Sequence, residues 1–191
     1  MVVNKEIINS KDSTHSSLRE SIIEHLFVGK ILETLWIKNL FEVEVLKPQV
    51  DDAGYDLVID CNSSQDKNHS SIRYIQLKSS RSNAKTARVS VSLKLTKKPN
   101  WCVIWIIFEQ TKTTLGLKHF RIFPNPDKPR PNMKDDSITF KKAKHTKGNS
   151  IGYKTVRPEH RVVPKKEFKT MNSIKEVVDW MFTKAQSKDE F

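Results

Sequence analysis

Three polar residues in two strand-like segments supply the kinds of group that metal-assisted chemistry needs. Asp56 lies at the start of the apolar segment "YDLVID", and Gln76 and Lys78 close the apolar segment "SIRYIQLK". Side chains alternate between the two faces of a strand, so Gln76 and Lys78 share a face. Carboxylate and amide oxygens can hold a hard cation, and a neighbouring ammonium can orient water at a phosphate. Brought together, these residues predict hydrolysis of a phosphodiester.

The spacing of the two segments indicates that they form an antiparallel hairpin. The polar stretch "CNSSQDKNHS" between them has the composition of an exposed loop. In a hairpin centred on Asp66, Asp56 falls directly opposite Gln76. The spacing therefore predicts that Asp56, Gln76 and Lys78 form one cluster at the end of the hairpin, just after a turn at Gly54.

An upstream helix is expected to bring a further carboxylate to this cluster. Two overlapping Ser-x-x-Glu capping boxes open a helical pattern that runs from Ser17 to Trp36. Glu24 lies on the apolar face of that pattern, whereas Glu33 lies on the opposite face. Glu20 lies one turn before Glu24 on nearly the same face, so either acid could be the inward one.

Helix acid, strand acid and Gln-Leu-Lys together resemble the PD-(D/E)XK nuclease superfamily, which includes many restriction endonucleases, archaeal Holliday-junction resolvases and Mrr-like enzymes. In that family an acid begins one strand and (Asp/Glu/Gln)-x-Lys ends the next. The resemblance implies that Glu24 is the helix acid, Asp56 the central metal ligand, Gln76 the second ligand and Lys78 the catalytic lysine. It also implies a metal ligand in the backbone carbonyl of Leu77.

The resemblance covers residues 15 to 110 and depends on context, because the tripeptide recurs at 65–67, 110–112 and 167–169. Two features depart from the family. Gln76 replaces a charged ligand by an amide, which attracts Mg²⁺ less strongly. The segment "ARVSVSLKL" alternates like a strand where the family has a helix.

The implied fold class is α/β, with a restriction-endonuclease-like core in which helices flank a mixed β-sheet. The implied cofactor is Mg²⁺ or Mn²⁺, and the implied partner is DNA, double-stranded or branched, in restriction or defence. Arg81, Lys85 and Arg88 closely follow the site and are expected to contact phosphates, with a solvated loop as the alternative.

Basic residues dominate the composition and point to a polyanionic partner. The chain has 34 Lys and Arg against 22 Asp and Glu, a net charge of +12. Between residues 118 and 170 there are eleven Lys and four Arg against three Asp and two Glu. Nucleic acid fits this excess, and charge alone does not distinguish DNA from RNA or from a lysine-rich soluble surface.

The pattern along the chain predicts a single domain. We expect an N-terminal tail at 1–12, a nuclease-like core at 13–112, a basic loop-rich extension at 113–171 and a C-terminal helix at 172–191 that packs on the core. The two cysteines lack disulfide or zinc spacing, and no segment has the length of a membrane span or a signal peptide. We therefore expect a cytoplasmic or nucleoid-associated protein with no membrane partner.

Other functions fit the same residues. The chain could be a non-catalytic nucleic-acid-binding subunit that keeps the nuclease fold, or a basic RNA-binding protein with an unrelated sheet. Asp56 would then be a turn residue, Lys78 a lysine whose stem packs at a strand end, and Glu24 one half of a structural ion pair. A homodimer or a place in a larger complex is also expected, because duplex cleavage needs two active sites or two visits.

Overall fold

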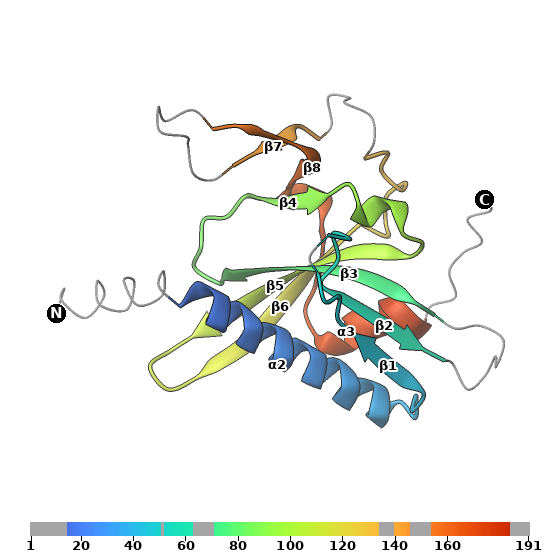
Figure 1. Ribbon diagram of the computed structural model, residues 1–191. Helices are drawn as coiled ribbons and strands as arrows, with labels where there is room; N and C mark the ends of the chain where they lie inside the picture. The colour runs from blue at the N-terminus through green and yellow to red at the C-terminus, as the bar shows by residue number, and fades with distance from the viewer. Residues whose placement is uncertain (1–14, 51, 63–70, 134–139, 146–153, 184–191) are drawn as a thin grey trace.

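Two β-sheets and two α-helices make up the part of the chain that the computed structural model describes, which is residues 15–50, 52–62, 71–133, 140–145 and 154–183. The fold is mixed α/β (Figure 1). The expected tail at 1–12 and the end of the expected C-terminal helix, 184–191, lie outside the described residues.

Six strands form the main sheet in the order β1-β2-β3-β5-β6-β9. β3 and β5 are parallel and the other neighbours are antiparallel, so the sheet is mixed as expected. The strands are β1 (Val43–Leu46), β2 (Leu57–Cys61), β3 (Arg73–Arg81), β5 (Trp101–Gln110), β6 (Leu115–Phe123) and β9 (Lys169–Met171).

Helix α2 (Ser16–Ile37) packs along one face of the main sheet (Figure 1). Its buried residues recur every four positions, as in an amphipathic helix: Ile23, Phe27, Ile31 and Leu35. His15 is the N-cap residue and makes no side-chain capping bond. Ser17 and Ser21 therefore lie inside the helix, and the capping boxes expected there do not begin it.

Helix α3 (Ile174–Val178) covers the same face and continues as a π-helical turn, Asp179–Thr183. The Ser173 hydroxyl accepts a hydrogen bond from the Glu176 N–H at 3.2 Å, which confirms the capping box predicted there. The buried Arg73 holds the end of this segment, because its Nη2 donates to the Met181 carbonyl at 2.7 Å.

A second sheet packs on part of the opposite face of the main sheet (Figure 1). It contains β4 (Arg88–Ser92), β8 (Val156–Pro164) and β7 (Lys142–Lys144), in the order β4-β8-β7. The range 113–171, expected to be a loop-rich extension, is thus shared between the two sheets, since β6 and β9 belong to the main one. Apolar and charged residues are mixed in β6 and β8, and the charged residues make the strand pattern difficult to recognise in the sequence.

The protein has two hydrophobic cores, a first core between the main sheet and the helices and a second core between the two sheets, and strand β5 contributes to both. Residues 102, 104, 106 and 108 pack with α2 and α3, and residues 101, 103, 105 and 107 pack under the second sheet. The sequence predicts this strand correctly, because a continuous apolar run is typical of burial on both faces. The crossover from β3 to the parallel β5 passes through β4 and a 3₁₀ helix, Leu95–Lys97, so the strand expected at 88–95 is present at 88–92.

Both cysteines are buried inside the first core. Burial raises the pKa of Cys61 to about 11, with a smaller contribution from Asp60, and raises the pKa of Cys102 to about 12. Both thiols therefore stay protonated and weakly reactive at neutral pH. None of the described helices is long and apolar enough to cross a membrane.

Two glycines make opposite demands on the fold, and a matched pair of substitutions should separate them. Gly54 has a φ of +77°, and an added Cβ would lie 2.5 Å from Ser92 Oγ. Gly54→Ala should therefore destabilise the protein by roughly 1–3 kcal/mol. Gly29, within α2, has nothing within 4 Å of an added Cβ, so Gly29→Ala should stabilise it by about 0.5–1 kcal/mol. Urea unfolding measures both, and a tolerated Gly54→Ala would contradict the close approach of β4.

Candidate metal and phosphate site

The hairpin of β2 and β3 has the register that the sequence predicts. Leu57 pairs with Ile75, and Ile59 pairs with Arg73. One step further, the Asp56 N–H donates to the Ile75 carbonyl at 2.8 Å. Asp56 therefore lies opposite Gln76, where β2 ends and β3 continues.

The Asp56 carboxylate takes the place of the missing strand partner of β3. Its Oδ2 accepts a hydrogen bond from the Leu77 N–H at 2.6 Å. A charge-assisted bond of this kind is stronger than one between neutral groups, so it fixes the carboxylate against β3. Beyond this point β3 has no partner on the β2 side among the described residues.

An open pocket of about 480 Å³ lies between the first turns of α2 and the end of β3. Its lining brings together acids and bases from four parts of the chain, with Leu77 between them: Glu20, Glu24, Lys47, Asp56 and Lys78. Four of the residues that the resemblance singles out thus line one pocket, with Glu20 beside them.

Glu24 is paired in this pocket with Lys47, which follows β1. The Glu24 side chain is 20% exposed and the Lys47 side chain 54% exposed. Among the described residues, Glu20 and Lys78 form no hydrogen bond or ion pair, so both helix acids and the lysine face the same space with different degrees of restraint. Sequence reasoning missed Lys47. The signal was the β1–β2 register, in which Leu46 pairs with Val58, so the next residue falls beside the start of β2.

Gln76 does not join the pocket lining. It is buried, and its Oε1 accepts a hydrogen bond from the Ser92 N–H at 3.3 Å. In β4 the odd-numbered positions bond to β8, as the Leu93 N–H to Glu159 carbonyl bond shows. The Ser92 N–H therefore points away from β8, and Gln76 satisfies it. The structure separates Gln76 from Asp56 and Lys78, although the backbone register is the predicted one.

The three basic residues after β3 differ in their surroundings. Arg81 ends β3, and its Nη2 donates to Gln110 Oε1 at 2.8 Å. Lys85 lies in the loop that follows, and Arg88 begins β4; both are exposed. Lys85 and Arg88 are thus accessible to a phosphate, whereas Arg81 is already hydrogen-bonded to Gln110 at the end of β5.

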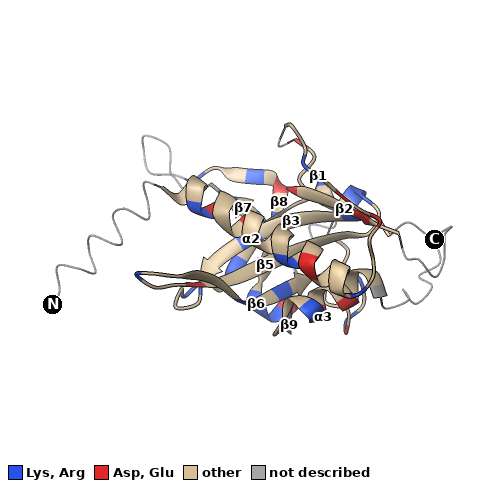
Figure 2. Cartoon of the chain, turned by 90° about the horizontal axis from the view of Figure 1, so that it is seen from below, with Lys and Arg blue, Asp and Glu red and all other residues tan. Residues whose placement is uncertain are grey.

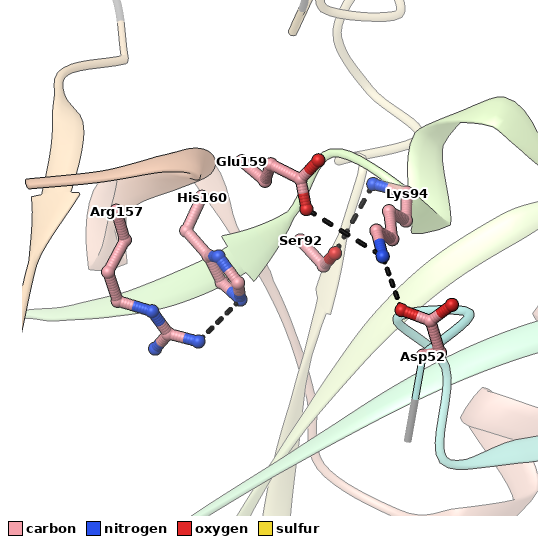
Figure 3. A network of polar contacts seen from close by, with 6 residues as sticks. All are labelled: Asp52, Ser92, Lys94, Arg157, Glu159 and His160. Carbon is pink, nitrogen blue, oxygen red and sulfur yellow. Dashed lines mark hydrogen bonds and ion pairs between the residues drawn. The ribbon is translucent and has the colours of Figure 1, made fainter. Parts of the chain in front are cut away.

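Lys94 fixes the second sheet to the turn before the site (Figure 3). Its ammonium pairs with Asp52 and lies 3.8 Å from Glu159 of β8. The hydrogen bond from Lys94 lowers the pKa of Asp52. Asp52 therefore serves a structural ion pair and is not part of the pocket lining. In β8 itself, Arg157 Nη2 lies 2.9 Å from His160 Nε2 (Figure 3).

The donors in the pocket fit a hard divalent cation. Asp56 offers a carboxylate and Leu77 a backbone carbonyl, with Glu20 or Glu24 as the third oxygen donor. The described part of the chain contains no ready-made group of three or more acidic, His or Cys side chains at metal-binding distance. Mg²⁺ does not need such a cage, because it usually takes one or two carboxylates, several waters and the substrate phosphate.

Comparisons with protein-family models, with curated proteins and with solved structures found no match for this chain. The case for a function therefore depends on the chemistry of this pocket.

The Gln76 contact predicts a loss of stability that a pocket residue would not show. Gln76→Ala removes the acceptor of the buried Ser92 N–H, so it should lower the free energy of unfolding by about 1–3 kcal/mol. Gln49→Ala removes an exposed amide that forms no hydrogen bond within the described residues, and it should change this free energy by no more than about 0.5 kcal/mol. Chemical denaturation of both variants provides the measurement, and equal small changes would show that Gln76 does not hold β4.

Proposed function

We propose that this chain is a Mg²⁺-dependent or Mn²⁺-dependent endonuclease of the PD-(D/E)XK type that hydrolyses phosphodiester bonds in DNA. The observation that supports it best is the shared pocket of Glu24, Asp56, Leu77 and Lys78. Glu24 comes from α2, Asp56 directly precedes β2, and Leu77 and Lys78 belong to β3; the predicted hairpin register brings Asp56 beside the two β3 residues.

Each residue has a distinct task in this proposal. Asp56 and the Leu77 carbonyl would hold the metal ion, with Glu20 or Glu24 completing the set of protein oxygens. A bound Mg²⁺ supplies charge neutralisation at the phosphate and a more acidic water. Lys78 orients the attacking water and stabilises the negative charge that develops on the phosphate in the transition state.

Gln76 has a different task from the one that the family pattern implies. Its amide oxygen is engaged with Ser92, so we assign it to positioning β4 beside the pocket. The missing acidic ligand is then supplied from α2, where two carboxylates line the pocket. The restriction-endonuclease-like core belongs to the same proposal, supported by a helix that precedes an antiparallel β1–β2–β3 unit with β5 parallel to β3. So do a cytoplasmic or nucleoid location, a role in restriction or defence, and assembly as a homodimer or complex subunit.

A second function is favoured by a specific set of contacts. Lys47 occupies the Glu24 carboxylate, and the Leu77 N–H occupies an oxygen of Asp56. A pocket with these internal pairs and an amide at position 76 could belong to a non-catalytic nucleic-acid-binding subunit that keeps the fold. Metal-dependent turnover separates the two functions.

Cleavage assays with matched acid and lysine variants test the proposal. The protein should cut supercoiled plasmid or linear DNA with Mg²⁺ or Mn²⁺ and should not cut with EDTA. Asp56→Asn and Lys78→Ala should each lower the rate by about 10²-fold or more, because they remove a metal ligand and a proton-transfer group. Comparing Glu20→Gln with Glu24→Gln identifies the helix acid that matters.

Glu33→Gln is the control, because Glu33 pairs with Lys30 on the exposed side of α2 and should keep full activity. Cleavage that survives both Asp56→Asn and Lys78→Ala would place any nuclease activity elsewhere. No cleavage by the unaltered protein under any metal condition would favour the binding subunit.

The Lys47–Glu24 pair predicts a competition between the lysine and the metal ion. Lys47→Met frees the Glu24 carboxylate and removes a positive charge, so Mn²⁺ should bind more tightly. The gain should be up to about fivefold, since an exposed ion pair contributes about 0.2–1 kcal/mol. Calorimetric titration measures it, with Lys30→Met as the control because Lys30 pairs with Glu33 outside the pocket. Weaker binding to Lys47→Met would mean that Glu24 is not a ligand.

A further inference from the structure

A row of basic side chains crosses three neighbouring strands on the face of the main sheet opposite α2. The strand register places Lys78 of β3 beside Trp105 of β5, and Trp105 beside Arg121 of β6. His119 lies two residues before Arg121 and therefore on the same face. The charge of Lys165 acts on His119 from the 3₁₀ helix before β9. We call Lys78, Arg121, His119 and Lys165 the basic strip.

Trp105 holds the centre of the basic strip in place. Its Nε1 donates to Ser80 Oγ at 3.0 Å, and the Arg121 guanidinium lies 5.2 Å from the centre of its ring. The Trp105 side chain is fully buried, so it is not available to stack on a nucleic-acid base. A ligand at this surface would therefore be bound through charge and hydrogen bonds.

Three cations act on His119. Burial lowers its pKa, and the charges of Arg121, Lys118 and Lys165 lower it further. Neighbouring cations repel one another, so an anion that binds between them is favoured because it offsets this repulsion. Figure 2 shows basic segments along β6.

No ion pair neutralises the strip within the described residues. Lys78, Arg121 and Lys165 make no contact with a carboxylate there, and Arg121 Nε is buried without a hydrogen-bond partner. On the opposite face, by contrast, Lys38 pairs with Asp179, and the one lysine in each helix, Lys30 of α2 and Lys175 of α3, also has an acidic partner. The unpaired cations of the strip thus lie on one side of the sheet, and Lys78 links them to the pocket.

We propose that the basic strip binds the phosphate backbone of the DNA strand beside the phosphate that occupies the pocket. Neighbouring strands lie about 4.8 Å apart, so the row spans about 10 Å from β3 to β6. Measured along the axis of duplex DNA, that distance corresponds to about three base-pair steps of roughly 3.4 Å each. Because contacts to phosphate oxygens carry no sequence information, this contact is independent of sequence. The inference rests on the proposed function only in taking Lys78 as the shared residue.

Equilibrium binding without metal tests the strip separately from catalysis. Fluorescence anisotropy in EDTA measures the affinity for labelled duplex and single-stranded DNA at several salt concentrations. The double variant Arg121→Gln with Lys165→Gln should bind about tenfold more weakly. It should also reduce the slope of log K against log salt by about 1.4 on single-stranded and 1.8 on duplex DNA.

The matched control removes two lysines from the opposite face, Lys30→Gln with Lys175→Gln, and should bind as the unaltered protein does. Arg121→Lys keeps the charge and should retain most of the affinity. If Arg121→Gln does not fold, His119→Gln with Lys165→Gln replaces it, since both side chains lie at the surface.

Unchanged binding by the folded strip variants, or an equal loss in the control, would overturn the strip whatever the cleavage assays show. Strip-dependent binding by a protein that cuts no DNA would support the strip and overturn only the nuclease. The same titration with labelled RNA tests the assignment to DNA. Strip variants that bind RNA more weakly but DNA unchanged would overturn it.

Discussion

The antiparallel register of β2 and β3 is the constraint on which the candidate site depends. Leu57 and Ile59 of β2 and Ile75 of β3 are fully buried against the helices. A slip of one residue would turn all of them toward the other face, so the core fixes the register strongly. That register places Asp56 opposite Gln76, and the carboxylate can then accept the Leu77 N–H where β2 stops. The site is therefore a consequence of packing several residues away from it.

β3 also explains why the site lies at its end. Its first half is covered on both faces, by the helices on one side and by the second sheet on the other. A buried polar side chain without a hydrogen bond lowers stability. The buried Gln76 avoids this loss because its side chain accepts a hydrogen bond from the Ser92 N–H. Lys78 lies where β2 has ended, so its ammonium can reach the pocket from the open edge of the strand. Gln76 is therefore part of the packed interior, whereas Lys78, two residues later on the same face of β3, is accessible to a ligand.

The parts that the sequence predicts well are those governed by local periodicity. The β2–β3 register, the burial of β5 on both faces and the capping box at Ser173 each follow from spacing within one or two elements. The environment of Gln76 could not be predicted in this way, because it depends on which edge of β4 lacks a partner after the second sheet has formed. Lys47 was missed because its place follows from the β1–β2 register rather than from its own neighbours. β9 is three residues long and carries too few alternations to be recognised as a strand.

Charge connects the pocket with the surface beside it. The pocket holds three carboxylates and two ammonium groups, so without a divalent cation it attracts a phosphate weakly. The basic strip has the opposite balance, with no carboxylate partner among the described residues. If both bind one DNA strand, binding of the metal ion and binding of the DNA must strengthen each other, since the ion reverses the net negative charge of the pocket. Such coupling is reciprocal: whatever the metal ion adds to the affinity for DNA, DNA adds to the affinity for the metal ion. Lys47 then has two opposite effects on the pocket: it neutralises Glu24 while the metal ion is absent, and it repels the metal ion when the ion binds.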